Sequence, residues 1–460
     1  MVNHYLVVTY KENNMIIKTK QEVEEKLREY ESLIPAIYEA GAFPNRFALK
    51  PSDWALSKEE IERPSLVAFI NGERKSFRPI ATMDLEFLSN ATIQKVKDCE
   101  LDLVSKYPCG LKCPGCFSQE GVYGDRTNLM TWQQVMDVVV DARLIGLKST
   151  KFLGPGEMFQ NPDLFDILDA FEKRGLPISI FTKGSELGSD ELAVKNFGNQ
   201  GIKSAKGLVN IVSKYECVRI LLGFNSFFSD RQDRMVGSSA TTRDYQITDG
   251  AFTSRGVTNY TEKRNQALVN LVEVGFNNPN RGQRLSLIAA PVSLEQIDEI
   301  PSMYVWAAKR NIPLVIAPTM ESGPKSIGLS NLNKRIDPNH EKLVQLMTAV
   351  YDTAIENGIM PLEQIRNEEV SAYMGTSPCN QVANGLYLRL NGRIQMCPGR
   401  SDSSAIYGNI HQTPLAEIWV NSPNYRMGAK INNWCTAKTE GRPKNVQTEV
   451  LRRLVEKYQK

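Results

Sequence analysis

The order of apolar and polar positions along the chain predicts strands that alternate with helices through its central part. Apolar residues recur at helical spacing after Thr131, which stands where a helix N-cap is expected. Further helices and a series of short apolar strands are expected in the same part of the chain. The helices lie at about residues 162–173, 261–274 and 294–310, and the strands at 101–104, 151–153, 178–182, 218–222, 285–289 and 314–317.

Strands that alternate with helices in this way indicate an α/β fold with a parallel sheet. The six strand–helix units predict a partial (β/α)6 barrel of the TIM type over residues 96–320. Barrels of this type carry their chemistry at the C-terminal ends of their strands. Residues that follow the predicted strands are therefore the first candidates for a functional site.

Residues 1–95 show a different pattern, which predicts an α+β N-terminal extension. One strand pair is expected at residues 4–9 and 15–18, and a second around a turn at Asn71-Gly72. A helix rich in Glu, Lys and Leu is expected between the two pairs, from about residue 20 to 40. We expect this extension to cover the substrate or to have a structural role.

Beyond the barrel, the pattern predicts a helical linker over residues 321–370 and a small domain over residues 371–445. Within this domain, an alternating run interrupted by Asn391-Gly392 predicts a β-hairpin, because this dipeptide favours tight hairpin turns. A helix is expected at residues 414–420, and a further helix is expected to end the chain over residues 446–460.

Composition excludes some classes of function. The 460 residues carry a formal net charge of +3, which does not indicate a nucleic-acid surface, so a nucleic-acid partner is not expected. No apolar run approaches the roughly 18 residues of a membrane span, and no signal peptide opens the chain. A cytoplasmic protein without a membrane partner is therefore expected. In such a chain, eight cysteines favour metal binding over disulfides.

Three of these cysteines, Cys109, Cys113 and Cys116, have the spacing C-x3-C-x2-C shortly after the first predicted strand. Three thiolates on one loop can each bind an iron of a 4Fe–4S cluster, for which cysteine is the usual ligand. No fourth cysteine follows nearby, so the fourth iron is left open to a small ligand, which favours catalysis over electron storage. A structural zinc site is the alternative, but it needs a fourth Cys or His, and the nearest further cysteine, Cys99, lies upstream of the strand.

The cysteine loop resembles the signature of the radical S-adenosylmethionine (SAM) enzymes. The resemblance implies that the open iron binds the amino and carboxylate groups of SAM. It also implies that an electron from the reduced cluster cleaves SAM to methionine and a 5′-deoxyadenosyl radical. One departure is Gly115, where the family often has an aromatic residue before the third cysteine. Phe117, directly after that cysteine, is expected to take over the packing against the cofactor.

The sequence after the second strand resembles a SAM-binding element of the same family. Gly154, Gly156 and Glu157 lie in Gly-Pro-Gly-Glu, which resembles the family's Gly-Gly-Glu with one proline inserted. In the family, the backbone and the acid of this element hold the SAM amino group. Glycine allows close approach of the backbone to a ligand, and a carboxylate is a natural partner for an ammonium group. An ordinary Gly–Pro turn is the alternative.

The resemblance extends to less specific residues after the later strands. Thr182 opens Thr-Lys-Gly, where the family has Thr-Asn-Gly, and Asn225 and Ser226 resemble the polar residues that bind the SAM ribose. Arg234 is a candidate partner of the SAM carboxylate, with a solvated helix charge as the alternative. Ile288 is a candidate adenine contact, with a core position as the alternative.

A second set of cysteines, Cys379, Cys397 and Cys435, lies beyond the barrel. The first two frame the pattern C-x12-G-x4-C, which resembles the SPASM or twitch extension of a radical SAM subgroup. A full SPASM extension has about seven cysteines for two auxiliary clusters, so three cysteines favour one auxiliary 4Fe–4S cluster of the twitch type. Its fourth iron is open to substrate or to an electron from the substrate, unless Cys99 or Cys217 supplies a ligand. Buried packing is the alternative for these cysteines and the expected role of Cys99 and Cys217.

The resemblance implies an enzyme that removes a hydrogen atom from an unactivated C–H bond, with a flavodoxin or ferredoxin as reductant. Residues 222–237 resemble members that act on sugars, aminocyclitols or nucleosides, so we expect oxidation or rearrangement of a small polar metabolite. A peptide maturase that forms a thioether or C–C crosslink is the alternative within the family. A non-catalytic iron–sulfur electron-transfer or scaffold protein is the alternative of another class, and the element that contains Glu157 argues against it.

Overall fold

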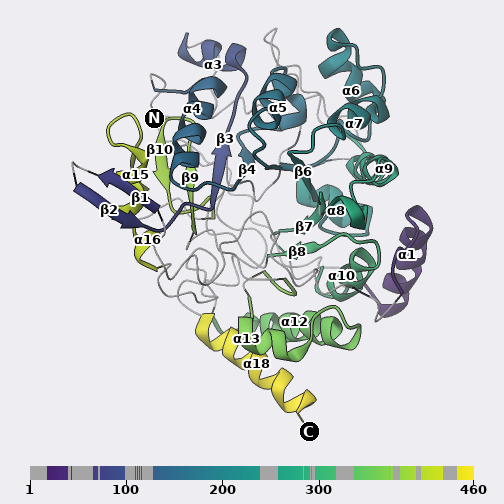
Figure 1. Ribbon diagram of the computed structural model, residues 1–460. Helices are drawn as coiled ribbons and strands as arrows, with labels where there is room; N and C mark the ends of the chain where they lie inside the picture. The colour runs from purple at the N-terminus through teal and green to yellow at the C-terminus, as the bar shows by residue number, and fades with distance from the viewer. Residues whose placement is uncertain are drawn as a thin grey trace, which may run out of the picture.

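The computed structural model of the chain (Figure 1) describes residues 18–39, 43, 66–70, 73–98, 109, 111, 113, 116, 128–238, 257–282, 284–290, 292, 296–317, 336–371, 373–376, 384–399, 406–427 and 443–459. Within these residues, nine strands form one sheet with the order β11-β10-β9-β3-β4-β5-β6-β7-β8. The strands from β3 to β8 follow one another in sequence and pair in parallel. They are β3 (Thr82–Glu86), β4 (Ser149–Gly154), β5 (Ile178–Thr182), β6 (Val218–Gly223), β7 (Leu285–Ala289) and β8 (Leu314–Ile316).

Helices connect these strands and lie on the outer side of the curved sheet (Figure 1). They are α3 (Asn90–Lys97) and α4 (Trp132–Leu144) after β3, α5 (Leu164–Glu172) after β4, α6 (Asp190–Phe197) and α7 (Ala205–Val212) after β5, α8 (Ser229–Val236) and α9 (Tyr260–Glu273) after β6, and α10 (Ile300–Ala308) after β7. Short 3-10 turns are η4 (Met158–Gln160), η5 (Gly198–Gln200) and η6 (Pro279–Arg281). The predicted α/β fold class, with six parallel strands and helical crossovers, is confirmed.

The helix after Thr131 forms as the sequence predicts. The Gln134 amide donates to the Thr131 hydroxyl at 3.3 Å, and the Thr131 amide donates to the Gln134 side chain at 2.9 Å, so both ends of a capping box are present. The apolar residues at helical spacing, Val135, Val139 and Ala142, are fully buried in the core. Local capping and long-range packing therefore favour the same helix.

The first strand of the parallel set is β3, ahead of the boundary expected at residue 96. The strand expected at residues 101–104 lies outside the described residues, and β3 itself pairs with β4. All five residues of β3 are buried although two of them, Asp84 and Glu86, are acidic. Lys151 of β4 lies 2.8 Å from Asp84 and compensates its charge. The segment expected as a separate extension over residues 1–95 thus contributes a strand to the sheet. Its two acidic residues interrupt the apolar pattern that ordinarily indicates a buried strand.

The C-terminal part of the chain continues the sheet on the other side of β3. β9 (Gly385–Leu388) pairs in parallel with β3, and β10 (Arg393–Gln395) and β11 (Ile406–Asn409) follow as antiparallel neighbours. Gly392 in the turn between β9 and β10 has a φ of 79°, in the region that favours glycine. The hairpin predicted at Asn391-Gly392 is confirmed. The helix predicted at residues 414–420 is α15 (Leu415–Asn421), which α16 (Pro423–Met427) follows.

Glu86, the last residue of β3, ties the C-terminal strands to the barrel strands. Its fully buried carboxylate accepts hydrogen bonds from the Tyr387 hydroxyl and, at 2.7 Å, from the Leu390 amide. The Nε of Arg389 lies 3.1 Å from the same carboxylate. These three partners lie on β9 or directly after it, so the C-terminal segment compensates a buried charge of the barrel.

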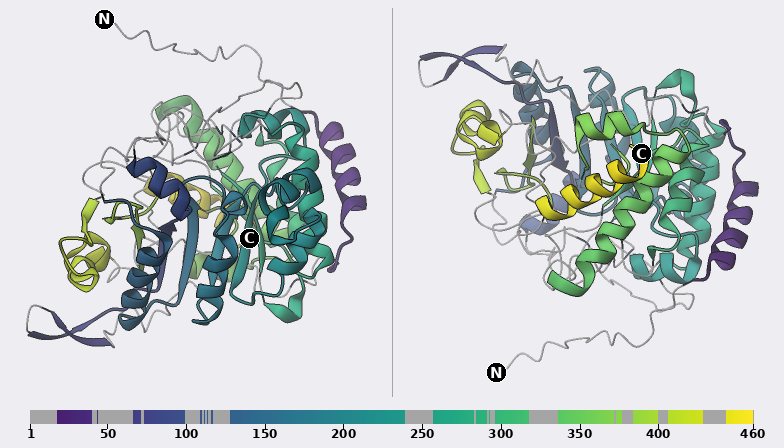
Figure 2. Two further views of the ribbon diagram at one scale, coloured as in Figure 1. Left: turned by 90° about the horizontal axis from the view of Figure 1, so that it is seen from above. Right: turned by 90° about the horizontal axis from the view of Figure 1, so that it is seen from below.

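Other helices pack around this sheet (Figures 1 and 2). α1 (Lys20–Leu33) lies beside α10, where the Trp306 indole donates to the Tyr30 carbonyl at 3.1 Å and the Arg310 Nε donates to the Ile34 carbonyl at 2.7 Å. α18 (Pro443–Tyr458), the predicted terminal helix, packs against α12 (Ile336–Glu356) and α13 (Leu362–Glu368) of the predicted helical linker.

Several boundaries differ from the expectations. The helix expected at residues 20–40 ends at Leu33, because Ile34 precedes a proline and is extended. The helix expected from about residue 294 begins at Ile300 as α10. The hairpin at Asn71-Gly72 is confirmed by the antiparallel pair β1 (Leu66–Ile70) and β2 (Glu73–Phe77). The strand pair expected at residues 4–9 and 15–18 lies outside the described residues, except for Lys18.

Among the helices of the described ranges, none is both long enough and apolar enough to cross a membrane.

Replacement of Glu86 by Ala is expected to lower the free energy of unfolding by about 3–5 kcal/mol, because Arg389 would stay buried without this carboxylate. Tyr387→Phe removes one hydrogen bond to the same group and is expected to cost about 2 kcal/mol. Urea unfolding of the anaerobically prepared protein, followed by circular dichroism, measures both. If Glu86→Ala proves no more destabilising than Tyr387→Phe, the carboxylate does not hold the two parts of the sheet together.

Candidate active site at the ends of the parallel strands

The three cysteines of the first motif lie on a tight loop. The Cys116 amide donates to the Cys113 carbonyl at 3.1 Å, and all three side chains are partly exposed. Cys109 and Cys113 pack against an apolar cluster that includes Val236 of α8 and Tyr260 of α9. Because both helices follow β6, the loop lies near the C-terminal end of this strand.

Charged groups from the neighbouring strand ends reach these cysteines. Enclosure by protein atoms raises the pKa of the Cys109 thiol, and the nearby Cys113 and Glu157 raise it further. Enclosure also raises the pKa of Cys113, whereas the positive charge of Lys183 acts in the opposite direction. Glu157, after β4, and Lys183, after β5, therefore lie near the cysteine loop.

Three thiols on one loop match the number of protein ligands of a 4Fe–4S cluster with one open iron. Thiolates that each bind a different corner of a cubane do not need to converge on one point. Cys109, Cys113 and Cys116 are therefore suited to three separate irons of a 4Fe–4S cluster.

The turn after β4 presents Glu157 toward this loop. Gly154 and Gly156 have φ angles of 131° and 85°, which other residues rarely adopt, and the peptide bond between Gly154 and Pro155 is cis. Glu157 caps η4, because its Oε1 accepts from the Phe159 amide at 3.3 Å. The glycines that the family resemblance singled out are thus required by the backbone of this turn.

Glu157 is also fixed by the end of β5. Its Oε2 accepts from the Lys183 amide at 3.0 Å, and the residue is only 9% exposed. Burial raises the pKa of Glu157, and the hydrogen bonds from Lys183 and Thr182 limit this rise. Donors from two loops therefore hold this buried acid in one orientation.

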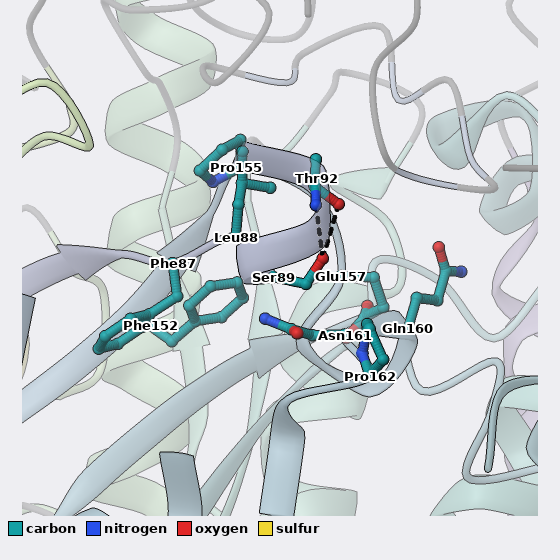
Figure 3. Close-up of a pocket in the computed structure, with 10 residues that line it drawn as sticks. All are labelled: Phe87, Leu88, Ser89, Thr92, Phe152, Pro155, Glu157, Gln160, Asn161 and Pro162. Carbon is teal, nitrogen blue, oxygen red and sulfur yellow. Dashed lines mark hydrogen bonds between the residues drawn. The ribbon is translucent and has the colours of Figure 1, made fainter. Parts of the chain in front are cut away.

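A pocket opens beside Glu157, between the ends of β3 and β4 (Figure 3). Phe87 and Phe152 form its apolar wall, and Ser89 and Asn161 contribute polar groups. The carboxylate that the sequence assigned to SAM binding therefore adjoins open space as well as the cysteine loop.

Tyr260 joins the ends of β5 and β6. Its hydroxyl lies 3.0 Å from the Lys183 carbonyl and 3.3 Å from the Gly223 carbonyl. Thr182 is buried, and its hydroxyl accepts from the Gly184 amide at 2.8 Å. The Thr-Lys-Gly segment is therefore a rigid turn with Lys183 at its centre.

Glu186 is a buried acid of this site that the sequence did not reveal. Its Oε1 accepts from the Gln160 side chain at 2.7 Å, and its other oxygen has no partner among the described residues. Burial and the nearby charge of Glu157 raise the pKa of Glu186 to about 8. An acid in a polar turn is ordinarily a surface residue, so only its tertiary neighbours identify it.

Asn225 and Ser226 follow β6 but have different surroundings. The Asn225 amide group is buried, and its side-chain nitrogen has no partner among the described residues. The Ser226 hydroxyl donates to Glu299 at 2.5 Å and accepts from the Phe228 amide at 3.0 Å. Asn225 thus retains a donor for a ligand, whereas the Ser226 hydroxyl is already used within the protein.

Glu299 organises the loop that contains these residues. Besides Ser226, it accepts from the Phe227 amide at 3.0 Å and from Arg231 at 3.1 Å. Burial raises its pKa to about 7, against the effect of these hydrogen bonds. Arg264 adds hydrogen bonds to the Ser226 carbonyl at 3.1 Å and to Gln232 at 3.0 Å. These buried hydrogen bonds therefore hold the loop after β6 in place.

The remaining candidates are more scattered. Arg234 is exposed on α8, and Ile288 is half-buried in β7. Cys217 is a buried core residue, as predicted. Cys397 is buried directly after β10. Phe117, Cys99, Cys379 and Cys435 lie outside the described residues.

Residues 379–444 match the SPASM family, described as an iron–sulfur cluster-binding domain. This segment contains all three cysteines that the sequence assigned to an auxiliary cluster. No curated protein matches the chain.

Several solved structures have weak similarity to the chain. SuiB of Streptococcus suis bound to S-adenosylmethionine has a TM-score of 0.44 at 15% identity, over 80% of this chain and 73% of its own. SuiB bound to the precursor peptide SuiA has a TM-score of 0.42 at 16% identity, over 82% and 71%. Native anSMEcpe with bound AdoMet has a TM-score of 0.44 at 11% identity, over 82% and 97%. Likeness at this level concerns the fold alone and assigns no residue a role.

The SPASM match supports the predicted iron–sulfur chemistry of the C-terminal segment, because the family binds iron–sulfur clusters.

Glu157→Gln keeps the size of the side chain and removes its charge. We expect SAM binding to weaken about tenfold or more, because a charged hydrogen bond contributes about 1.5–3 kcal/mol. Anaerobic equilibrium dialysis measures the affinity, and iron and sulfide content is expected to stay unchanged. Glu191→Gln, on the exposed side of α6, is the matched control. Equal SAM affinity in the two variants would remove Glu157 from the site.

Stability is expected to depend on pH through Glu186, whose pKa rises from 4.5 to about 8 on folding. Between these values the unfolded chain has lost the proton and the folded protein retains it, so the wild type loses stability as pH increases. Glu186→Gln cannot titrate. Its unfolding temperature relative to the wild type should therefore rise between about pH 5 and about pH 8. Parallel pH profiles for the two proteins would contradict this assignment.

Proposed function

We propose that the chain is a radical SAM enzyme whose Cys109, Cys113 and Cys116 hold the SAM-binding 4Fe–4S cluster. The observation that carries the proposal is that Glu157 lies beside this cysteine loop, oriented by the end of β5. When bound, the cluster and SAM supply reductive cleavage of SAM and abstraction of a substrate hydrogen atom. A flavodoxin or ferredoxin is the proposed reductant.

The residues around the loop bind and orient the cofactor. Glu157 accepts a hydrogen bond from the SAM ammonium group, and the glycine turn brings the backbone close to it. The buried amide nitrogen of Asn225 offers a donor to the ribose. Phe117 is proposed to pack against the cofactor, and Ile288 to contact the adenine. The apolar contacts of Cys109 and Cys113 exclude water from one side of the loop.

Cys379, Cys397 and Cys435 are proposed to hold one auxiliary 4Fe–4S cluster, which takes an electron from the substrate or binds it directly. The pairing of β9 with β3 supports this proposal, because it fixes the auxiliary segment beside the barrel.

The substrate is proposed to be a small polar metabolite that is oxidised or rearranged. The resemblance of residues 222–237 to sugar-type enzymes no longer supports this substrate class. The polar residues Ser226, Arg231 and Gln232 of this stretch are buried and hydrogen-bonded within the protein. That stretch therefore selects no substrate class by itself. A peptide substrate is the second candidate, since SuiB has been solved with the precursor peptide SuiA and anSMEcpe with the Cp18Cys peptide.

Iron content and SAM cleavage test the proposal together. Anaerobically reconstituted protein is expected to contain about eight irons per chain, and about four after Cys379, Cys397 and Cys435 are changed to Ala. With SAM and dithionite, the unmutated protein should release 5′-deoxyadenosine. Assays with pools of small polar metabolites and of short peptides then identify which class increases this release.

Cys217→Ala is the matched control, because this cysteine is buried in the core and should not change the iron content. Four irons in the unmutated protein would mean that the C-terminal cysteines hold no cluster. Iron without SAM cleavage would favour the non-catalytic alternative.

A further inference from the structure

Lys183 is the central residue of the Thr-Lys-Gly turn, where the family has asparagine. It follows β5, and its amide donates to Glu157 Oε2 at 3.0 Å. Its side chain is half-buried and makes no hydrogen bond or ion pair with any described residue through its ammonium group. A cation in such a position is available to an anionic ligand.

Gly223 determines where this side chain lies. A Cβ atom built on Gly223 would stand 2.8 Å from Cδ and 2.9 Å from Nζ of Lys183. The lysine therefore crosses the end of β6 directly over the glycine backbone and occupies the space that any larger residue would fill. Gly223 has no positive φ angle, so its backbone conformation does not require glycine. Glycine is favoured there because Lys183 lies so close.

Lys183 and Glu157 stand close to each other without forming an ion pair. The lysine charge acts on both Glu157 and Cys113, so its ammonium lies near the carboxylate and near the cysteine loop. The carboxylate is directed to the amides of Lys183 and Phe159 instead. The site thus presents one anion and one cation side by side, each held by its own strand end.

An α-amino-acid group carries the complementary pair of charges, an ammonium and a carboxylate on one carbon. We propose that Lys183 and Glu157 together bind the amino-acid end of SAM, with Lys183 as the partner of its carboxylate. This inference rests on the proposed function and changes one assignment, because Arg234, the earlier candidate for the carboxylate, is exposed on α8.

The inference is tested by comparing SAM with decarboxylated SAM, which has the same sulfonium, adenosine and amine but no carboxylate. The affinity of both is measured by anaerobic equilibrium dialysis with the cluster-loaded protein. Lys183→Met is expected to weaken SAM binding about 10-fold to 100-fold, as for loss of a charged hydrogen bond, and to leave decarboxylated SAM nearly unaffected. Lys183→Arg should retain most of the preference for SAM.

Gly223→Ala provides an independent test without a change of charge. Its methyl group should displace the tip of Lys183 and reduce the preference for SAM over decarboxylated SAM, as Lys183→Met does. Lys203→Met, which removes an exposed lysine before α7, is the matched control and should keep the wild-type preference.

The outcomes separate this inference from the proposed function. If the wild type binds and cleaves SAM but Lys183→Met weakens both ligands equally, the lysine does not recognise the carboxylate and the inference fails alone. Loss of iron in Lys183→Met, without a change in preference per loaded cluster, would assign the lysine to the cysteine loop instead. If the wild type neither binds nor cleaves SAM, the proposed function itself fails.

Discussion

The buried carboxylate of Glu86 is the interaction on which the architecture depends. It ends β3, the strand that stands between the barrel strands and the C-terminal strands, and Tyr387, Arg389 and Leu390 of the C-terminal segment compensate its charge. An acid in the middle of a sheet would be costly without these donors. The barrel and the cluster-binding segment are therefore joined by main-chain pairing and by a charge that neither part satisfies alone.

A second buried network sets the shape of the strand ends. Glu299 lies before α10, yet it holds the loop after β6 through Ser226, Phe227 and Arg231. Arg264 continues this network to Tyr30 of α1 at 2.7 Å. The N-terminal helix is in this way connected to the same loop that supports the site. Because the polar groups are buried and bonded to one another, the loop has little freedom to move with respect to β6.

The site itself combines strong local signals with contacts that no local signal predicts. The cysteine spacing and the Gly-Pro-Gly-Glu turn can be recognised in the sequence, because tight loops and positive φ angles restrict which residues are allowed. In the structure, Glu157 lies close enough to Cys109 to raise the pKa of its thiol. Arg234 is exposed on α8, and the Ser226 hydroxyl donates to Glu299. Glu186 and Lys183 gain their importance only from the groups that surround them.

Sequence by itself determined the features that depend on neighbours a few residues away. These include the Thr131 capping box, the amphipathic helices, the Asn391-Gly392 turn, and the spacing of the cysteine motifs. Tertiary structure decided which strand opens the sheet and which polar residues face one another. Glu86 meets a partner 301 residues away and Ser226 meets one 73 residues away, so their burial depends on contacts that local patterns do not encode. The physical reason is that hydrophobic periodicity predicts burial only for apolar residues. Buried charges are tolerated only where distant parts of the chain supply their partners, and the local sequence does not show which parts do so.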